Sequence, residues 1–305
     1  MRENVSLAPF VTLRLGGKAD YFAEAATVAE LAEITISAHV RQENPTVLGW
    51  GSNVLPSDEG VPGLVVRNVT RGLTVDDEGG VVADSGIGLQ DLFLQTVQRG
   101  WGGLEYAVGI PGSLGGALVS NAGAYRSSIS EFITELEMVI DGERRWVPPA
   151  YMQFSYRDSI LRQVPTPRAV VLQVRFRLPR TDPWQSFQEA REYQRQRISK
   201  QPPSPSAGSF FKNVTDQSVA NSLPALPLAL KEKGIVPAGF LIESVGMKGF
   251  RLGGVGWGKR HANFMLNLER GTARQVAELA EITKDKVFRA YGVALESEVL
   301  YLGRW

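Results

Sequence analysis

The sequence predicts an α+β fold built from two domains. Stretches of alternating apolar and polar residues fill the N-terminal half, apolar residues at helical spacing mark a few longer segments, and the composition turns polar and then proline-rich near residue 200. With 305 residues, 43% of them hydrophobic, the chain is long enough to bury a substantial core. We therefore expect an N-terminal domain over residues 1–180, a C-terminal domain over 181–292 and a final strand over 293–305.

Helices and short strands are expected in the N-terminal half. Thr27 and Glu30 have the spacing of a capping box and predict a helix over the apolar positions that follow. Gly100 is expected to end a second helix. The Asp141-Gly142 pair between two alternating stretches predicts a hairpin. Strands are expected at 45–55, where the chain runs into a glycine turn, and at 63–68, 72–77, 80–86, 132–147 and 168–178.

The C-terminal part begins with a polar helix within residues 181–200, which we expect Ser186 and Glu189 to open. The Pro- and Ser-rich stretch that follows is typical of a linker. Thr272 and Gln275 predict the capping box of a long helix that ends at Gly292. A short helix is expected to start at Pro237, and strands are expected near 250–254, 262–268 and 293–303.

The composition excludes several classes of function. Lys plus Arg (33) against Asp plus Glu (32) leaves a net charge of +1, so no broad positive field is available to bind nucleic acid. The sequence has no cysteine, which excludes thiolate chemistry, and His39 and His261 are too few for a multi-histidine metal site. We expect no metal. Because the sequence shows neither an apolar signal region nor a membrane-spanning apolar run, we expect a cytoplasmic protein without membrane contact.

Two glycine clusters are candidates for a binding site. GWGSNVL at residues 49–55 follows a buried strand, and GIPGSLGGALVSNAGAY at 109–125 consists mostly of small and aliphatic residues. Glycine lets backbone N–H groups approach a ligand closely, with Ser113 and Asn121 as polar anchors. The alternative for the first cluster is a plain tight turn. Neither cluster matches the dinucleotide or P-loop fingerprints, so a phosphate cradle here would be of another type.

These clusters, together with TLRLGGKADYF at 12–22, resemble the UDP-N-acetylenolpyruvoylglucosamine reductase (MurB) family. FSYRDSI at 154–160, SKQPPSPSAGSFFKN at 199–213 and LESEV at 295–299 extend the resemblance to nearly the whole chain. It implies a vanillyl-alcohol-oxidase-like (PCMH-type) FAD-binding domain in two subdomains and an α+β substrate-binding domain. It also implies that NADPH reduces non-covalently bound FAD, through which the enolpyruvyl ether of UDP-N-acetylglucosamine becomes UDP-N-acetylmuramate in peptidoglycan precursor synthesis.

The resemblance further implies roles for residues at matching positions. Hydride transfer from the flavin to C3 of the enolpyruvyl group would leave an enolate-like intermediate that Arg157 and Glu298 stabilise, and Ser209 would protonate C2. Lys200 and Asn213 fall where the family contacts its substrate. The residues implied to contact FAD are Gly49, Gly51, Ser52, Asn53, Pro111, Gly112, Ser113, Gly115, Gly116, Asn121 and Gly123.

Each of the more polar candidates also has a structural interpretation. Arg157 can pair with a neighbouring acid, and the Ser209 hydroxyl can serve as a local cap or turn. Strand alternation places Glu298 among apolar neighbours, which tends to raise the pKa of a carboxyl group, but a solvated strand end is the alternative. We interpret His261 as structural, and Lys200 either as a diphosphate ligand or as a solvated lysine.

The sequence departs from the family pattern at several places. The interval between FSYRDSI and GSFFKN holds one strand and one helix, so the substrate-covering loop of one MurB subgroup is expected to be absent, as in the loop-lacking type II. Pro56 and Arg126 replace an aliphatic residue and a glycine that are common there, and the segment 214–236 is long. The alternatives are a flavoprotein oxidase on the same scaffold and a non-catalytic relative that only binds UDP-sugar or flavin. We expect a monomer.

Overall fold

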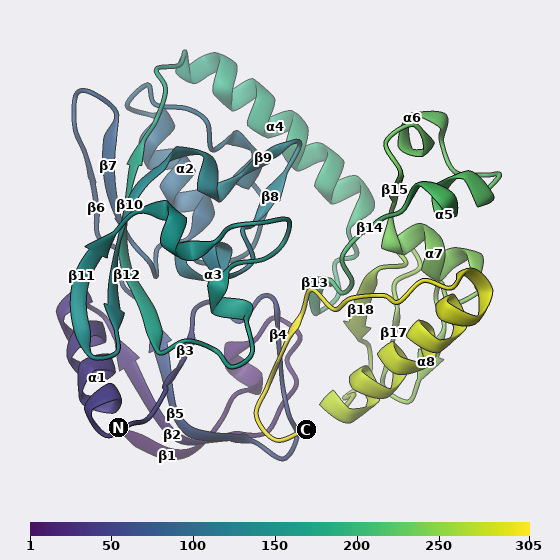
Figure 1. Ribbon diagram of the computed structural model, residues 1–305, viewed down its shortest axis with the longest axis horizontal. Helices are drawn as coiled ribbons and strands as arrows, with labels where there is room; N and C mark the ends of the chain where they lie inside the picture. Colours follow the sequence, from purple (N-terminus) through teal and green to yellow (C-terminus); the bar gives the residue numbers. More distant parts are fainter. The chain divides into compact units, whose positions relative to one another are not determined.

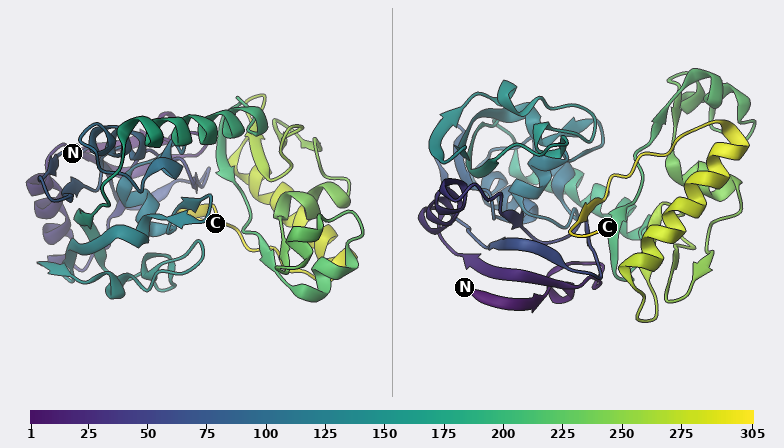
Figure 2. Two further views of the ribbon diagram at one scale, coloured as in Figure 1. Left: turned by 90° about the horizontal axis from the view of Figure 1, so that it is seen from above. Right: turned by 60° about the horizontal axis from the view of Figure 1, so that its bottom comes forward.

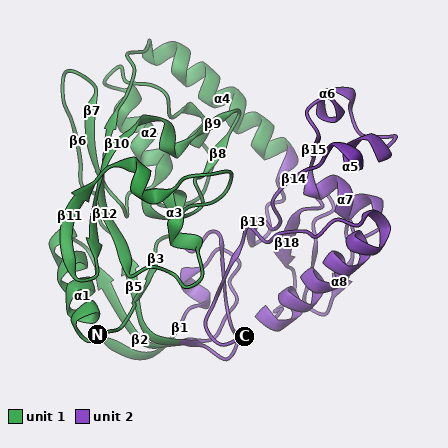
Figure 3. Cartoon of the chain, in the orientation of Figure 1, with its two compact units in different colours: residues 1–5, 19–50, 62–199 green, residues 6–18, 51–61, 200–305 purple.

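The chain divides into two compact units. The computed structural model describes all residues from Met1 to Trp305. Unit 1 comprises residues 1–5, 19–50 and 62–199, and unit 2 comprises 6–18, 51–61 and 200–305 (Figure 3). The Pro- and Ser-rich stretch therefore begins where the chain passes from unit 1 to unit 2. No sequence pattern indicated that two N-terminal segments belong with the C-terminal residues.

Unit 1 is built on two sheets (Figure 1). The first has the order β1-β2-β5-β3, and the second is antiparallel with the order β11-β10-β12-β7-β6. The strands of the first sheet are β1 (Arg2–Ser6), β2 (Lys18–Ala25), β3 (Thr46–Leu48) and β5 (Val61–Asn68). Those of the second sheet are β6 (Leu73–Val75), β7 (Gly80–Asp84), β10 (Ile133–Ile140), β11 (Glu143–Val147) and β12 (Ala169–Arg177).

Helix α1 (Val28–Val40) packs between the two sheets. The capping box that Thr27 and Glu30 predict is present, because the Thr27 side chain accepts from the Glu30 N–H while the Glu30 carboxylate accepts from the Thr27 N–H. The apolar face of α1 shares one buried cluster with strands of both sheets. Its buried members are Ala25, Leu31, Ala32, Leu64, Val66, Val139, Val170 and Leu172.

The opposite face of the five-stranded sheet carries the larger core of unit 1. Helix α2 (Leu89–Val97) packs there, and Gly100 follows it at φ +82°. The predicted hairpin is confirmed, with Asp141 and Gly142 both at positive φ between β10 and β11. The remaining elements of unit 1 include η2 (Glu105–Ala107), α3 (Leu114–Val119), β8 (Gly123–Ala124), β9 (Ser127–Ser128), η3 (Ile129–Phe132), η4 (Pro149–Met152) and η5 (Ile160–Arg162).

The predicted start of the polar helix is wrong. Helix α4 runs over Pro183–Lys200, so Ser186 lies inside its first turn instead of capping it. The carboxylate of Asp182 accepts from the Trp184 N–H (2.8 Å), and the Ser186 hydroxyl instead bonds the Thr181 hydroxyl (2.8 Å). Ser186 is 3% exposed, so its side chain is used in packing where a cap would have to face the helix end.

Unit 2 combines a four-stranded sheet, in the order β13-β18-β17-β16, with the long helix α8 (Ala273–Tyr291). The capping box of Thr272 and Gln275 and the left-handed Gly292 cap confirm the predicted bounds of α8, which runs the length of this unit (Figure 2). Other elements are η1 (Ala8–Phe10), β4 (Val54–Pro56), β13 (Ser206–Ser209), β14 (Val214–Thr215), α5 (Gln217–Ser222), α6 (Leu228–Lys231), β15 (Ile235–Val236), α7 (Ala238–Ser244), β16 (Arg251–Leu252), β17 (Val255–Trp257), β18 (Phe264–Asn267) and β19 (Leu300–Leu302).

The final strand is shorter than predicted because it changes partner. The Lys212 N–H donates to the Glu296 carbonyl (2.9 Å) and the Glu298 N–H donates to the Phe210 carbonyl (2.8 Å), which pairs this part with the residues that directly follow β13. The Leu300 N–H then donates to the Asn53 carbonyl, and β19 continues as the parallel partner of β4. The regular ladder is therefore confined to Leu300–Leu302.

The buried histidine of unit 1 is expected to make stability depend on pH. His39 is 1% exposed, and its Nδ1 accepts from the Gly142 N–H (3.0 Å). Burial, with a smaller effect of Arg168, lowers the pKa of His39. Folded protein therefore keeps His39 neutral, while the unfolded chain takes up a proton below about pH 6.5.

The free energy of unfolding is accordingly expected to fall as pH drops from about 6.5 toward the lowered pKa, because there the unfolded state binds more protons. Urea denaturation at a series of pH values across this window measures the fall. His39→Gln should show a smaller fall than the wild type. An identical pH profile in both proteins would contradict the assignment to His39.

Candidate active site

The predicted site residues lie in both units. Unit 1 contains Arg157 together with most of the predicted FAD contacts, namely Gly49, Pro111, Gly112, Ser113, Gly115, Gly116, Asn121 and Gly123. Unit 2 contains Ser209 and Glu298, the predicted FAD contacts Gly51, Ser52 and Asn53, and the predicted substrate contacts Lys200 and Asn213. The site is described below for each unit by itself.

The two glycine clusters meet in unit 1 at Gly49 and Ser113. A Cβ atom on Gly49 would come closer to the Ser113 hydroxyl oxygen than the 3.0 Å that real Cβ atoms keep. Ser113 caps α3, since its hydroxyl accepts from the Gly116 N–H (3.3 Å), and Gly115 packs against the backbone of Ser85. Glycine at these positions therefore lets the two clusters pack closely against each other and against Ser85. We call the segment formed by Gly49, Ser113, Gly115 and Gly116, which consists mainly of backbone, the cradle.

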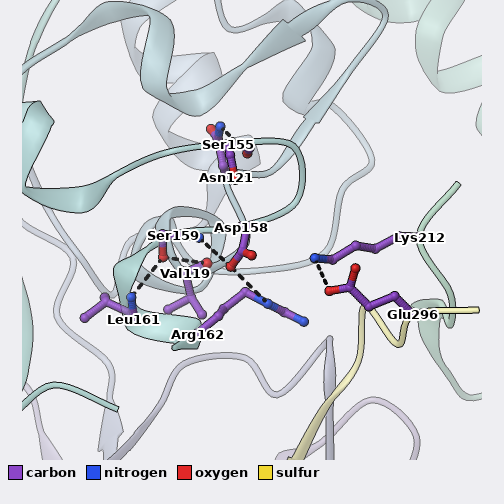
Figure 4. Close-up of polar contacts among 9 residues, drawn as sticks. All are labelled: Val119, Asn121, Ser155, Asp158, Ser159, Leu161, Arg162, Lys212 and Glu296. Atoms are coloured by element: carbon purple, nitrogen blue, oxygen red, sulfur yellow. Dashed lines mark hydrogen bonds and ion pairs between the residues drawn. The ribbon is translucent and has the colours of Figure 1, made fainter. Parts of the chain in front are cut away.

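Asn121 and Arg157 lie at one end of this cradle. The Asn121 side chain donates to the Ser155 carbonyl (3.0 Å), while its Oδ1 is buried and has no hydrogen-bond partner within the protein (Figure 4). The Arg157 guanidinium donates to the backbone carbonyls of Asn121 and Gly123. A buried acceptor without a partner fits a ligand donor, so the cradle suits FAD, and Arg157 is fixed by the same loop.

Several residues of this loop, and Arg157 beside it, have strained backbone conformations. Asn121 (φ +41°), Tyr125 (φ +52°), Arg126 (φ +74°) and Arg157 (φ +54°) all adopt left-handed conformations that residues other than glycine seldom occupy. Such strain tends to persist where the surrounding structure fixes a binding site. The positive φ also explains why glycine is common at the position of Arg126, since glycine adopts this conformation without strain.

Replacing Arg126 with glycine is expected to raise the free energy of unfolding by about 0.5–1 kcal/mol, because glycine adopts this φ without strain. Urea denaturation measures the change. Arg191→Gly is the control, since Arg191 is exposed within α4 and glycine there should lower the free energy of unfolding by about 1 kcal/mol. Destabilisation by both variants would contradict the strain argument.

In unit 2, the segments that carry Ser209 and Glu298 run side by side. Ser209 ends β13 and pairs with Phe264, and the next residue, Phe210, accepts the Glu298 N–H. Ser209 and Glu298 are both partly exposed, while Val299 beside Glu298 is buried. The backbone therefore brings together two of the three residues predicted to be catalytic.

Further contacts join the motifs in unit 2. The Lys212 ammonium, 9% exposed, pairs with the Glu296 carboxylate at 2.5 Å (Figure 4). Lys212 belongs to GSFFKN and Glu296 to LESEV, so the pair links the same two segments. The Asn53 side chain donates to the Ala207 carbonyl (3.1 Å), which ties the first glycine cluster to β13.

The two predicted substrate contacts have different surroundings. Lys200 is exposed at the end of α4 and contributes, after burial, to lowering the pKa of His261. Asn213 accepts the Ala238 N–H at the start of α7 (3.1 Å), a bond that orients its side chain within the fold. His261 accepts the Asn263 N–H through Nδ1 (3.3 Å), in line with the structural interpretation.

One cluster beside Arg157 was missed by sequence reasoning. The rings of Tyr125 and Tyr193 stack with centroids 3.8 Å apart, and the Arg197 guanidinium lies 5.6 Å from the Tyr125 ring. Arg197 also donates to the Tyr106 carbonyl (3.1 Å), and burial, followed by the nearby charge of Arg157, lowers its pKa. Tyr193 and Arg197 lie four residues apart on α4, and only the fold brings them to the loop that holds Tyr125.

The family match of unit 1 identifies the class, which is that of FAD-binding proteins. Residues 19–146 match the FAD binding domain family, and residues 199–302 match the family described as UDP-N-acetylenolpyruvoylglucosamine reductase, C-terminal domain. The chain belongs to the UDP-N-acetylenolpyruvoylglucosamine reductase family. No helix of the structure combines the length and apolar character needed to cross a membrane.

Individual relatives match over the full length. The UDP-N-acetylenolpyruvoylglucosamine reductase of Synechococcus sp. (strain JA-3-3Ab) is 37% identical, over 99% of this chain and 91% of the relative. That of Acaryochloris marina is 38% identical, over 99% and 92%. The crystal structure of the reductase (MurB) from Thermus caldophilus superposes with a TM-score of 0.78 at 30% identity and covers 98% of both chains.

Proposed function

We propose that the protein reduces UDP-N-acetylglucosamine enolpyruvate to UDP-N-acetylmuramate with NADPH and FAD, in the cytoplasm and as a monomer. The observation that carries this proposal is the 37% identity over 99% of the chain to a reductase of that name. The cradle at Gly49 and Ser113 fits the cofactor that this chemistry needs. In this assignment residues 1–180 bind FAD, residues 181–292 bind substrate, and residues 293–305 form the strand with the catalytic glutamate.

Bound FAD would supply the hydride for C3 of the enolpyruvyl group, and the residues of the chain would position the reactants and stabilise the charge that develops. In unit 1, the eight predicted contacts from Gly49 to Gly123, most of them glycines, would hold the cofactor. The other three predicted FAD contacts belong to unit 2 and are Gly51, Ser52 and Asn53. Because the chain has no cysteine and His39 lies in helix α1, we assign non-covalent FAD.

Arg157 and Glu298 act on the carboxyl end of the substrate. Addition of hydride at C3 builds negative charge on the substrate carboxylate, and a fixed guanidinium lowers the energy of that charge in the transition state. Arg157 is held by two backbone carbonyls, so it needs little reorganisation when the charge develops. Glu298 polarises the same group from the strand that pairs with Phe210.

Ser209 donates the proton to C2. A serine hydroxyl is a weak acid, but the carbon of an enolate-like species is strongly basic, so the transfer is feasible when the hydroxyl is correctly placed. Lys200 and Asn213 bind the substrate, Lys200 through the charge of the diphosphate. The hydroxyl, guanidinium and carboxylate thus have separate tasks in one addition across a C=C bond.

An anaerobic titration tests the function. The purified protein should show the visible spectrum of oxidised flavin, bleach on addition of NADPH, and recover only when UDP-N-acetylglucosamine enolpyruvate is added. A protein that cannot be reconstituted with FAD would overturn the proposal. Bleaching that the substrate does not reverse, combined with consumption of dioxygen in the presence of a small alcohol, would favour the flavoprotein oxidase instead.

A further inference from the structure

The carboxamide of Asn263 forms hydrogen bonds with the backbone directly after Ser209. Asn263 is 2% exposed and precedes β18. Its Oδ1 accepts the Phe211 N–H (2.9 Å), its Nδ2 donates to the Phe211 carbonyl (2.8 Å), and its own carbonyl accepts the Phe210 N–H (2.8 Å). One residue therefore satisfies three backbone groups of two consecutive residues.

These side-chain hydrogen bonds take the place of strand pairing at the point where the ladder of β13 and β18 ends. β13 pairs with β18 at Ser206 and Ser209, and no regular ladder continues beyond Ser209. An amide side chain carries the same donor and acceptor as a peptide group, so it can complete the hydrogen bonding of an isolated strand residue. Phe211 is 1% exposed, and its two backbone groups depend on this side chain.

On its other edge, the segment 210–212 pairs with the residues around Glu298. The Phe210 carbonyl accepts the Glu298 N–H, the Lys212 N–H donates to the Glu296 carbonyl, and Phe211 bridges to Ser297. Residues 210–212 thus lie between the Asn263 carboxamide and the strand that carries Glu298. A shift of this segment would displace Ser209 and Glu298 relative to each other.

We propose that Asn263 is a positioning residue that sets the register of Ser209 against Glu298 for protonation of the substrate. This inference rests on the proposed function, in which Ser209 is the proton donor. Asn263 acts through the backbone of Phe210 and Phe211 and touches neither substrate nor cofactor in this role. Misplacement of a reacting group by about 1 Å can lower a rate by about a hundredfold.

The test measures the two half-reactions of Asn263→Ala separately by anaerobic stopped flow on the FAD-loaded protein, with rates expressed per bound flavin. Flavin reduction by NADPH should keep its wild-type rate. Reoxidation by UDP-N-acetylglucosamine enolpyruvate should slow about ten- to a hundredfold, and its solvent deuterium isotope effect should rise because proton transfer becomes rate-limiting. Wild-type rates for both half-reactions would overturn the inference.

Asn263→Asp supplies a second readout that also applies where the alanine variant folds poorly. A protonated carboxyl offers one donor and one acceptor, as the amide does, whereas the ionised form offers acceptors only. In Asn263→Asp, the rate of flavin reoxidation by the substrate should therefore recover as pH is lowered. His261 faces the same backbone and can titrate too, so Asn263→Ala, which keeps His261, is the control and should show no such recovery. Recovery in both variants, or in neither, would contradict the role of the carboxamide.

Two further variants distinguish failure of the positioning role from failure of the proposed function. Asn267→Ala removes a comparable side-chain clamp at the other end of β18, where Nδ2 donates to the Leu13 carbonyl (3.1 Å) and Oδ1 accepts the Gly271 N–H (3.0 Å). It should lower the melting temperature without slowing reoxidation. Ser209→Ala is measured in parallel: unimpaired reoxidation there would refute the proposed function, whereas impaired Ser209→Ala with unimpaired Asn263→Ala would refute only the positioning role.

Discussion

Ser209→Ala is expected to reoxidise about 10²–10⁴-fold more slowly with substrate than the wild type while its flavin is still reduced rapidly by NADPH. The reason is that reduction by NADPH needs no proton at C2 of the substrate, whereas turnover of the enolate-like species does. Anaerobic stopped-flow absorbance of the flavin resolves the two steps. The separation follows directly from the assignment of Ser209 as the proton donor.

Ser206→Ala is the matched control for this experiment. Ser206 lies in the same strand, β13, is also partly exposed, and accepts the Thr12 hydroxyl through its carbonyl, which the substitution leaves in place. It should react like the wild type in both half-reactions. If Ser209→Ala slows both half-reactions equally, Ser209 is not the proton donor and its hydroxyl has a general structural role.

Gly49→Ala is expected to weaken FAD binding by at least about tenfold, which corresponds to about 1.4 kcal/mol. The new Cβ would overlap the Ser113 hydroxyl, so Ser113 must move and the cap that it forms with the Gly116 N–H is lost. Both glycine clusters would then shift at the point where they meet. Fluorescence titration of apoprotein with FAD measures the change in Kd.

Ser113→Ala and the double variant identify the cause of that loss. Ser113→Ala alone removes the cap, at a cost of about 1 kcal/mol in stability, without introducing a clash. Adding it to Gly49→Ala removes the closest overlapping atom, although the Ser113 Cβ would remain only 3.1 Å away, so part of the FAD affinity should return. Unchanged FAD affinity in Gly49→Ala would show that the cofactor does not use this cradle.

Local sequence signals predicted the elements whose ends depend on neighbouring residues. Thr27 and Thr272 each have their partner three residues on, and both helices begin as predicted. The start of α4 was misplaced because Ser186 and Glu189 have the same spacing, while the side chain of Ser186 is buried against Thr181. Burial is set by the tertiary fold, so spacing alone could not distinguish a cap from a packed serine.

The predicted length of the last strand was wrong for a different reason. Its alternation correctly separates the buried Val293, Leu295 and Val299 from Glu296 and Glu298. Alternation defines faces, but it contains no information on which strand lies alongside. The exchange from the end of β13 to β4 depends on segments more than 80 residues away in sequence.

The candidate site likewise contains residues that sequence motifs indicate and residues that only the fold identifies. The residues assigned to FAD, substrate and proton transfer came from motifs that resemble a family, and their roles stay predictions. Asn263 and Arg197 had no such signal, because an asparagine before a strand and an arginine on a polar helix are common. Their partners, Phe211 and Tyr125, are 52 and 72 residues away, so only the folded chain identifies them.

The pairing of β4 with β19 has a consequence for synthesis of the protein on the ribosome. Val54–Pro56 leave the exit tunnel long before their partner Leu300–Leu302 is translated. A nascent chain that has reached residue 199 contains every residue of unit 1, whereas its segments 6–18 and 51–61 still wait for the rest of unit 2. Folding during translation therefore leaves this strand edge unpaired until Leu300–Leu302 have been translated. Unpaired strand edges favour aggregation of incompletely folded chains.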